Sequence, residues 1–198
     1  MRKVIQDNRS TRRTRGAIQA SLLSLLREKP LSKITVQEII DRANVCRTTF
    51  YAHFEDIYDL VGRMGDAVID EAGETLSRLA TPDGRVPGEY PTITAVVRLY
   101  AKHRETIRLL IGPNGDPTFD KRMQAKISEV SRMLRKRVDG ERFNEHAHRL
   151  YLLYVVPGGM SVLNDLVRSG KPWDTKRTGE VLGAMAAMGE KIFLEAKL

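Results

Sequence analysis

Apolar residues recur at intervals of three and four along most of the chain, whereas strict alternation of apolar and polar residues is almost absent. This pattern is typical of amphipathic helices that each bury one face, and it predicts an all-α fold. The first helix is expected to begin near Ser10 and to end before Pro30. Its apolar face consists of Ile18, Leu22, Leu25 and Leu26.

The segment ITVQEIIDRAN, residues 34–44, carries a strong helix-start signal. Thr35 and Glu38 have the spacing of a capping box, in which each side chain satisfies a backbone donor beside the other. A helix is therefore predicted over 36–43. Asn44 is expected to end it, because asparagine tolerates the left-handed conformation. A hydrophobic staple is expected between Ile34 and Ile39.

A second short helix is predicted to begin near Arg47, and a longer one is predicted from the N-cap Asp56 toward Leu79. The stretch at 81–91 is dense in proline and glycine and is expected to be a loop. Further helices are expected at 92–103, 104–111, 118–138, 144–169 and 176–196.

Two short helices joined by a tight turn form a helix-turn-helix, whose second helix can enter the major groove of DNA. The residues expected to pack between the two helices are Ile39, Ile40, Ala43, Val45 and Phe50. The residues left on the outside are Arg47, Thr48, Thr49 and Ala52. The alternative interpretation of this outer face is a polar cap on an ordinary helical hairpin.

The outer residues have the chemistry of DNA recognition. Arginine can pair with the O6 and N7 acceptors of guanine, and threonine can contact bases or phosphates. Arg47, Thr48 and Thr49 are therefore expected to read DNA. Further contacts to phosphates, which position a protein without specifying sequence, are expected from Lys33, Thr35, Tyr51 and His53.

The distribution of charge favours a polyanionic partner. The chain has a net charge of +8, and residues 1–55 hold 11 Lys or Arg against 5 Asp or Glu, a net charge of +6. A basic N-terminal arm is expected to follow the DNA backbone or to enter the minor groove. Its arginines are Arg9, Arg12, Arg13 and Arg15. A solvated tail with no partner is the alternative.

Other classes of function have little support. Cys46 is the single cysteine, which excludes an internal disulfide and a multi-cysteine metal site. The sequence contains no metal-ligand spacing of histidines, phosphate loop or nucleophile elbow, so we expect no catalytic residue, cofactor or metal. It also contains no run of about 18 apolar residues and no secretory signal. We therefore expect a cytoplasmic protein that is not an enzyme and has no membrane span.

The segment ITVQEIIDRANVCRTTFYAHFEDIYDL resembles the DNA-binding segment of the tetracycline-repressor (TetR) family of bacterial regulators. The resemblance extends over about residues 10–60 and includes the Thr-Val helix start, the turn, and Phe-Tyr-x-His-Phe. It implies a three-helix DNA-binding domain over 1–58 and a helical effector-binding and dimerisation domain over 59–198. It also implies a homodimeric transcription regulator, and we expect a repressor that a small-molecule effector releases from a palindromic operator.

Three residues depart from the family pattern. Asn44 replaces the usual glycine and can adopt the same backbone conformation. Cys46 replaces the usual serine, which predicts weaker capping of the second helix. Ile57 replaces the usual lysine, so one phosphate contact is missing or passes to a neighbour such as Tyr58. These losses leave an alternative open, a co-regulator of the same fold that binds a protein partner and no longer binds DNA.

The C-terminal part is expected to dimerise. The final helix has a broad apolar face that includes Val181, Met185, Met188 and Ile192. A homodimer interface is expected through the helices at 144–169 and 176–196, and an intrachain core is the alternative. Pro157 and the two glycines after it are expected to kink or break the first of these helices.

The resemblance also implies a pocket for an unknown small-molecule effector among the middle helices. The residues expected to line it, because their side chains are polar-tipped or adaptable, are Tyr100, His103, Phe119, Met123 and Tyr154.

Overall fold

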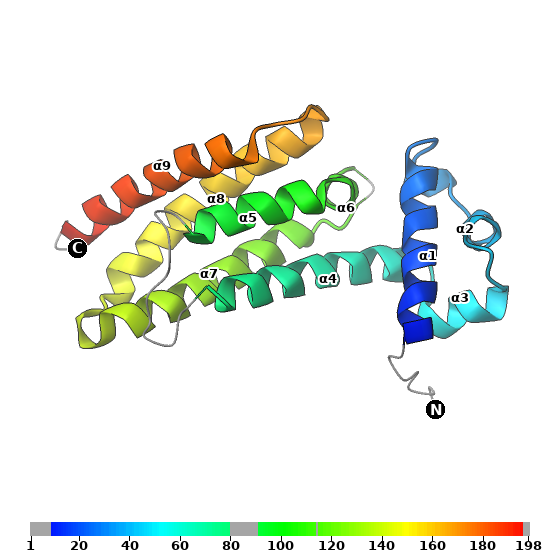
Figure 1. The fold of residues 1–198 in the computed structure, drawn as a ribbon, viewed down its shortest axis with the longest axis horizontal. Helices are drawn as coiled ribbons and strands as arrows, with labels where there is room; N and C mark the ends of the chain where they lie inside the picture. Colours follow the sequence, from blue (N-terminus) through cyan, green and yellow to red (C-terminus); the bar gives the residue numbers. More distant parts are fainter. Residues whose placement is uncertain (1–8, 80–90, 114, 196–198) are drawn as a thin grey trace.

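Figure 1 shows a computed structural model of the chain, an elongated molecule in which a three-helix bundle lies at one end of a larger helical body. The structure describes residues 9–79, 91–113 and 115–195. All regular elements within these residues are helices, which confirms the predicted all-α fold. The predicted loop at 81–91 lies outside the described residues except for Pro91.

The helix bounds agree with the predicted ones to within a few residues. The N-terminal bundle consists of α1 (Arg9–Leu26), the 3-10 helix η1 (Leu31–Lys33), α2 (Val36–Ala43) and α3 (Arg47–His53). The body consists of α4 (Ile57–Ser77), α5 (Pro91–Lys102), α6 (Arg104–Leu110), α7 (Phe119–Asp139), η2 (Gly140–Arg142), α8 (Glu145–Ser169) and α9 (Thr175–Glu195).

Local capping interactions define the ends of the helices around the turn. The backbone N–H of Glu38 donates to the Thr35 hydroxyl at 3.3 Å, and the backbone N–H of Thr35 donates to the Glu38 carboxylate at 3.0 Å, so the predicted capping box is present. Asn44 ends α2 in the left-handed region with φ 51°. The Asp56 carboxylate accepts from the backbone N–H of Asp59 at 2.7 Å and caps α4.

A continuous apolar core joins the bundle to the body. The fully buried residues Ile18, Leu22, Ile39 and Phe50 fill the bundle. The core continues through buried residues of α4, and α4 in turn packs along α7. The same helix therefore supports the bundle at its N-terminal end and belongs to the body over the rest of its length (Figure 1).

The predicted break at Pro157 is wrong, because α8 runs without interruption from Glu145 to Ser169. Proline has no N–H, so the carbonyl of Leu153, four residues earlier, loses its usual partner in the helix. Pro157 and Leu153 are both exposed, and water can satisfy that carbonyl. The helix therefore tolerates proline at this position.

By length and composition alone, α8 is apolar enough to cross a membrane. In the structure it packs against α5, α6, α7 and α9, and its buried residues include His148 and Asn164. This helix is therefore packed within the helical body.

Candidate nucleic-acid interface

The helix α3 has one face anchored in the core and one face toward solvent. Phe50 and Phe54 are almost fully buried, and their ring centroids lie 5.7 Å apart. On the opposite face Arg47, Thr48 and Ala52 are exposed, as the sequence pattern predicted, whereas Thr49 is half-buried. Because the buried rings fix the rotation of the short helix, its polar face is held toward solvent.

Arg47 lies along the outer face of α3. Its guanidinium carbon is 5.6 Å from the centroid of the Tyr51 ring, a cation–π contact within one turn of the helix. In the described part of the chain Arg47 forms no ion pair, so its donors remain available to a ligand. The Tyr51 side chain is 44% exposed and lies beside Arg47 on the same surface.

The start of α3 has the weak cap that the cysteine predicted. Cys46 makes no capping hydrogen bond to the helix backbone. Its Sγ instead lies 3.0 Å from the Thr48 hydroxyl and 2.9 Å from the Thr49 hydroxyl. These contacts, first that of Thr48 and then that of Thr49, lower the pKa of the exposed Cys46 thiol to about 7. The hydroxyls of Thr48 and Thr49 therefore both contact the thiol at the start of α3.

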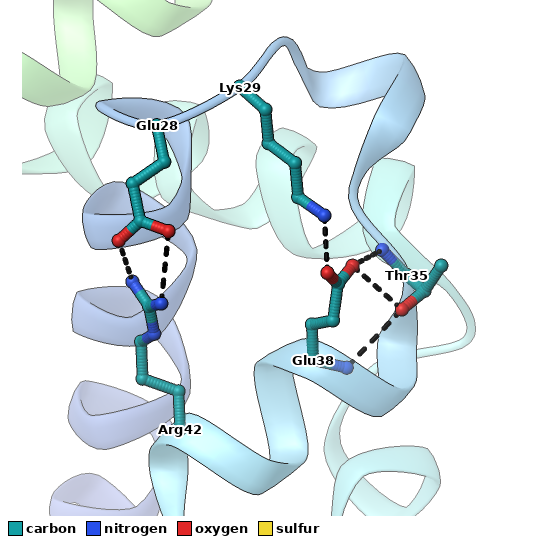
Figure 2. A network of polar contacts seen from close by, with 5 residues as sticks. All are labelled: Glu28, Lys29, Thr35, Glu38 and Arg42. Carbon is teal, nitrogen blue, oxygen red and sulfur yellow. Dashed lines mark hydrogen bonds and ion pairs between the residues drawn. The ribbon is translucent and has the colours of Figure 1, made fainter.

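Ion pairs join the segment that follows α1 to α2 and stabilise the bundle (Figure 2). The Arg42 guanidinium donates to both carboxylate oxygens of Glu28, at 2.6 and 3.1 Å, and also donates to the Ser24 hydroxyl at 2.9 Å. Arg42 lies in the last turn of α2 and Glu28 just after α1. The bidentate pair thus orients the helix that precedes the turn.

A second part of the network surrounds the start of α2 (Figure 2). Lys29 pairs with the Glu38 carboxylate, which also accepts from the Thr35 backbone N–H and hydroxyl. The Lys29 contact, followed by the two from Thr35, lowers the pKa of Glu38 to about 2. Both donors of Thr35 are therefore engaged. A phosphate at this helix start would instead meet the unpaired backbone N–H groups of Val36 and Gln37.

The arginines of the predicted basic arm lie in α1, in agreement with the predicted helix start near Ser10. Arg9 to Arg15 form the first turns of α1, so they belong to a helix. Arg9, Arg12 and Arg13 are exposed and have the i, i+3, i+4 spacing that places side chains on one face. Lys33, in η1, is also exposed. A helical presentation of the arginines favours contact with the DNA backbone over insertion of an extended arm into the minor groove.

His53 differs most from its predicted role. The side chain is 8% exposed, and its buried Nδ1 has no hydrogen-bond partner in the part of the chain that the structure describes. Burial, followed by the charges of Arg15 and Arg63, lowers the pKa of His53. A neutral, buried imidazole is poorly suited to bind phosphate as a cation. The signal for this burial was its position three residues after Phe50, on the core side of the helix.

The phosphate-contacting lysine of the family is replaced by a half-buried residue, Ile57, at the start of α4. Its neighbour Tyr58 is 67% exposed and has a hydroxyl able to contact a phosphate in its place.

Most of the predicted effector-binding residues belong to the packed core. Tyr100, Phe119 and Met123 are fully buried, and His103 Nε2 lies 2.9 Å from the Glu71 carboxylate. The structure contains an apolar cavity elsewhere, of about 550 Å³ between α5, α7, α8 and α9. Of the five predicted residues, Tyr154 lines this cavity. Sequence reasoning missed its buried polar residue, His148, because no local motif marks it.

Comparison with known proteins identifies the bundle. Residues 19–64 match the sequence profile of bacterial regulatory proteins of the tetR family. This segment contains α2, α3 and their turn, together with the C-terminal part of α1 and the start of α4. The bundle is a DNA-binding domain of the TetR family. No curated protein matches the sequence at a significant level.

Solved structures share the fold over nearly the whole length of this chain. The dihydroxyacetone kinase operon activator DhaS aligns with a TM-score of 0.69 and 13% identity, over 91% of this chain and 97% of that chain. A TetR transcriptional regulator from Streptococcus agalactiae 2603V aligns with a TM-score of 0.56 and 21% identity, over 90% of this chain and 96% of that chain. At these identities the likeness shows a common fold.

Proposed function

We propose that the chain is a cytoplasmic, homodimeric repressor that binds a palindromic DNA operator and leaves it when a small-molecule effector binds the body. The observation that carries this proposal is the outer face of α3. It presents Arg47, Thr48 and Tyr51 on a helix whose inner face is held by the buried rings of Phe50 and Phe54. A helix with its polar side chains held in this way suits the major groove.

The homodimer part of the proposal rests on an exposed apolar surface formed by α8 and α9. Its most exposed residues include Tyr154 at 72%, Met188 at 68% and Ile192 at 63%. Among the residues whose side chains the structure describes, the exposed large apolar ones on this α8–α9 surface are Leu153, Tyr154, Val162, Val181, Met185, Met188 and Ile192. Apolar patches of this kind mark interaction surfaces. Two such helix pairs would form a four-helix interface around a twofold axis.

Twofold symmetry has a direct consequence for the operator. The two copies of α3 in a homodimer face opposite strands, so the half-sites must be inverted repeats. Their spacing follows from the distance between the bundles in the dimer.

Effector release would be a thermodynamic coupling between the body and the bundle. A ligand that prefers the conformation with low operator affinity shifts the population toward it. DhaS, which has this fold, is named an operon activator, so the sign of regulation is itself a result that the experiments must supply.

The alternative is a co-regulator that does not bind DNA. It is supported by the uncapped start of α3 and by Ile57, which replaces a lysine that would contact phosphate. Selection of DNA duplexes from a random pool at near-physiological salt separates the two functions. Recovery of an inverted repeat supports the regulator. Arg47→Ala should then lose about 1–3 kcal/mol of discrimination at one base position. Arg137→Ala, which removes an exposed charge in the last turn of α7, should not. Recovery of no motif by the wild-type protein would contradict the repressor.

The homodimer has its own test. Met188→Glu places a charge in the α8–α9 surface and should convert the dimer to a monomer in sedimentation equilibrium. Met133→Glu is the matched control, because Met133 is 48% exposed on α7 and lies outside that surface. Equal behaviour of the two variants would contradict the proposed interface.

A further inference from the structure

The cavity between α5, α7, α8 and α9 has the properties of a ligand site. Its volume of about 550 Å³ lies within the range of small-molecule pockets. Most of its lining is aliphatic, including Ile93, Ile127, Leu134, Leu152, Leu163 and Ala186. It lies in the part of the body that includes the start of α5 and the end of α7, remote from α3 (Figure 1).

His148 supplies an unsatisfied polar group to this apolar lining. Its side chain is 4% exposed, and the buried Nε2 atom has no hydrogen-bond partner among the described residues. The ring packs between Phe143 and Tyr151, with centroid distances of 5.4 and 5.7 Å. Buried polar atoms without partners are rare in proteins, since each forfeits its hydration. A ligand with a hydrogen-bonding group would restore the missing bond.

The imidazole is neutral in this environment. Burial, followed by the charge of Arg135, lowers the pKa of His148, although Asp139 acts in the opposite direction. A neutral imidazole can accept or donate at Nε2, depending on its tautomer. The cavity therefore suits a hydroxyl, amide or carbonyl group at this point.

The charged side chains of the lining lie within ion-pair distance of opposite charges, although Arg135 Nε, like His148 Nε2, makes no hydrogen bond to the described residues. Among the described residues that line the cavity, the charged ones are Arg135 and Glu190, with Nε 3.5 Å from Oε1. Arg135 Nε also lies 2.7 Å from the carboxylate of Asp139. An ionic ligand would lose its hydration without finding a free counter-charge, which disfavours it.

We propose that this cavity binds an uncharged, largely apolar small molecule with one hydrogen-bonding group directed at Nε2 of His148. The idea that this molecule is the effector rests on the proposed function. Binding of a ligand to the cavity does not, because it is measured without DNA. The cavity opens toward the α8–α9 surface, because Tyr154, Val162 and Met185 both line it and are exposed. The second copy in a homodimer would cover that opening.

The first test uses the neutral dye N-phenyl-1-naphthylamine, whose fluorescence rises in apolar surroundings. We expect saturable binding of one dye per chain to the full-length protein. Gly159→Leu should weaken it at least tenfold, because Gly159 lines the cavity and an added Cβ there meets no atom within 4 Å. The new side chain would occupy the cavity without disturbing the helix.

Two control variants establish where the dye binds. Gly62→Leu makes the same change in α4, also with no atom within 4 Å of the added Cβ, and should leave dye binding unchanged. Met133→Gln reduces exposed apolar surface outside both the cavity and the α8–α9 surface, and should also leave dye binding unchanged. Absence of dye binding, as when a partner side chain fills the cavity, would overturn the proposal. Loss of dye binding in Met133→Gln with retention in Gly159→Leu would do so too.

The second test measures the chemical class of the ligand by displacement of the dye at pH 7. 1-Naphthol should bind about three- to tenfold more tightly than naphthalene, the gain of one hydrogen bond. The anion 1-naphthoate should bind at least tenfold more weakly than 1-naphthol. His148→Leu should abolish the preference for 1-naphthol and retain binding of naphthalene. A preference that persists in His148→Leu, or tighter binding of 1-naphthoate, would overturn the assignment.

These outcomes are independent of the operator experiment. If the protein selects no DNA but binds the dye in the expected pattern, the repressor is refuted and the ligand site is supported. If the protein selects an operator but binds none of the probes, the ligand site is refuted and DNA binding is supported.

Discussion

Arg27 at the end of α1 and Glu105 in α6 form an ion pair between the DNA-binding bundle and the body, with Nη2 2.5 Å from Oε1 and 2.6 Å from Oε2. Both side chains are largely exposed, so the pair adds little to the free energy of unfolding. Its position is more informative, because it joins two parts of the chain that a regulator must couple.

Charge reversal tests that coupling. Arg27→Glu should reduce operator affinity by about fivefold, which corresponds to the low end of typical coupling energies. The thermal midpoint should stay nearly unchanged. The swap Arg27→Glu with Glu105→Arg rebuilds the pair in the opposite direction and should restore affinity. Fluorescence anisotropy with the selected operator measures both. If the swap binds as weakly as the single variant, Arg27 acts directly on DNA.

The arginines at the start of α1 should contribute to affinity without contributing to sequence preference. Arg13 is exposed in a helical turn beside the bundle. Arg13→Ala should reduce the slope of log K against log salt by about 0.9 for each protomer and leave discrimination between operators intact. The slope from titrations at several salt concentrations is the measurement. An unchanged slope would place Arg13 away from phosphate.

Cys46 should make DNA binding sensitive to thiol chemistry. Because the pKa of this exposed thiol is lowered to about 7, chiefly by Thr48, half of it is thiolate near neutral pH. The rate of alkylation by iodoacetamide should reach half its maximum near pH 7, and the modified protein should lose operator binding. Thr48→Val should move that midpoint upward. Retained binding after complete alkylation would show that the start of α3 does not approach DNA.

Cys46→Ser is the control for the alkylation experiment, since the variant lacks the only thiol in the chain. It should bind DNA before and after treatment. Serine is also a better N-cap than cysteine, so the variant should have a higher thermal midpoint, by about 2–4 °C.

Two buried histidines should make the protein less stable in acid. The pKa values of His53 and His148 are both lowered, in each case first by burial. Below the unfolded-state value of 6.5, the unfolded chain binds protons that the folded chain does not. The free energy of unfolding should therefore fall as pH decreases from 6.5 toward the lowered values, and should not depend on these groups above that range.

Denaturant titrations at several pH values measure this dependence. His53→Gln and His148→Gln should each reduce the loss of stability between neutral and mildly acidic pH. The exposed His146 provides the control, because His146→Gln should leave the pH dependence as in the wild type. If the two buried variants retain the full dependence, other groups cause it.

The features that were predicted correctly are local in the chain. The capping box of Thr35 and Glu38, the left-handed Asn44 and the N-cap Asp56 form between residues no more than four apart. Such interactions are available in any conformation that forms the local turn, so the sequence predicts them. The outer face of α3 follows in the same way from helical periodicity.

The misplaced residues depended on contacts between distant segments. His53 is buried beside Arg15 of α1 and Arg63 of α4, and its polarity alone favoured an exposed site. Tyr100 and Phe119 are adaptable side chains that packing between helices placed in the core. The apolar cavity lies elsewhere for the same reason.

Neighbouring residues were enough to establish that this protein is helical, where its helices begin and end, and which short helix presents arginine and threonine on its outer face. Local hydrogen bonds and apolar periodicity are encoded over a few positions, which explains that success. Packing between helices was needed to establish that Glu38 is shared between Thr35 and Lys29, that His148 lines a cavity, and that Met188 stays exposed. These properties arise from segments far apart in the chain, where volume and desolvation, more than local preference, determine the environment of each side chain.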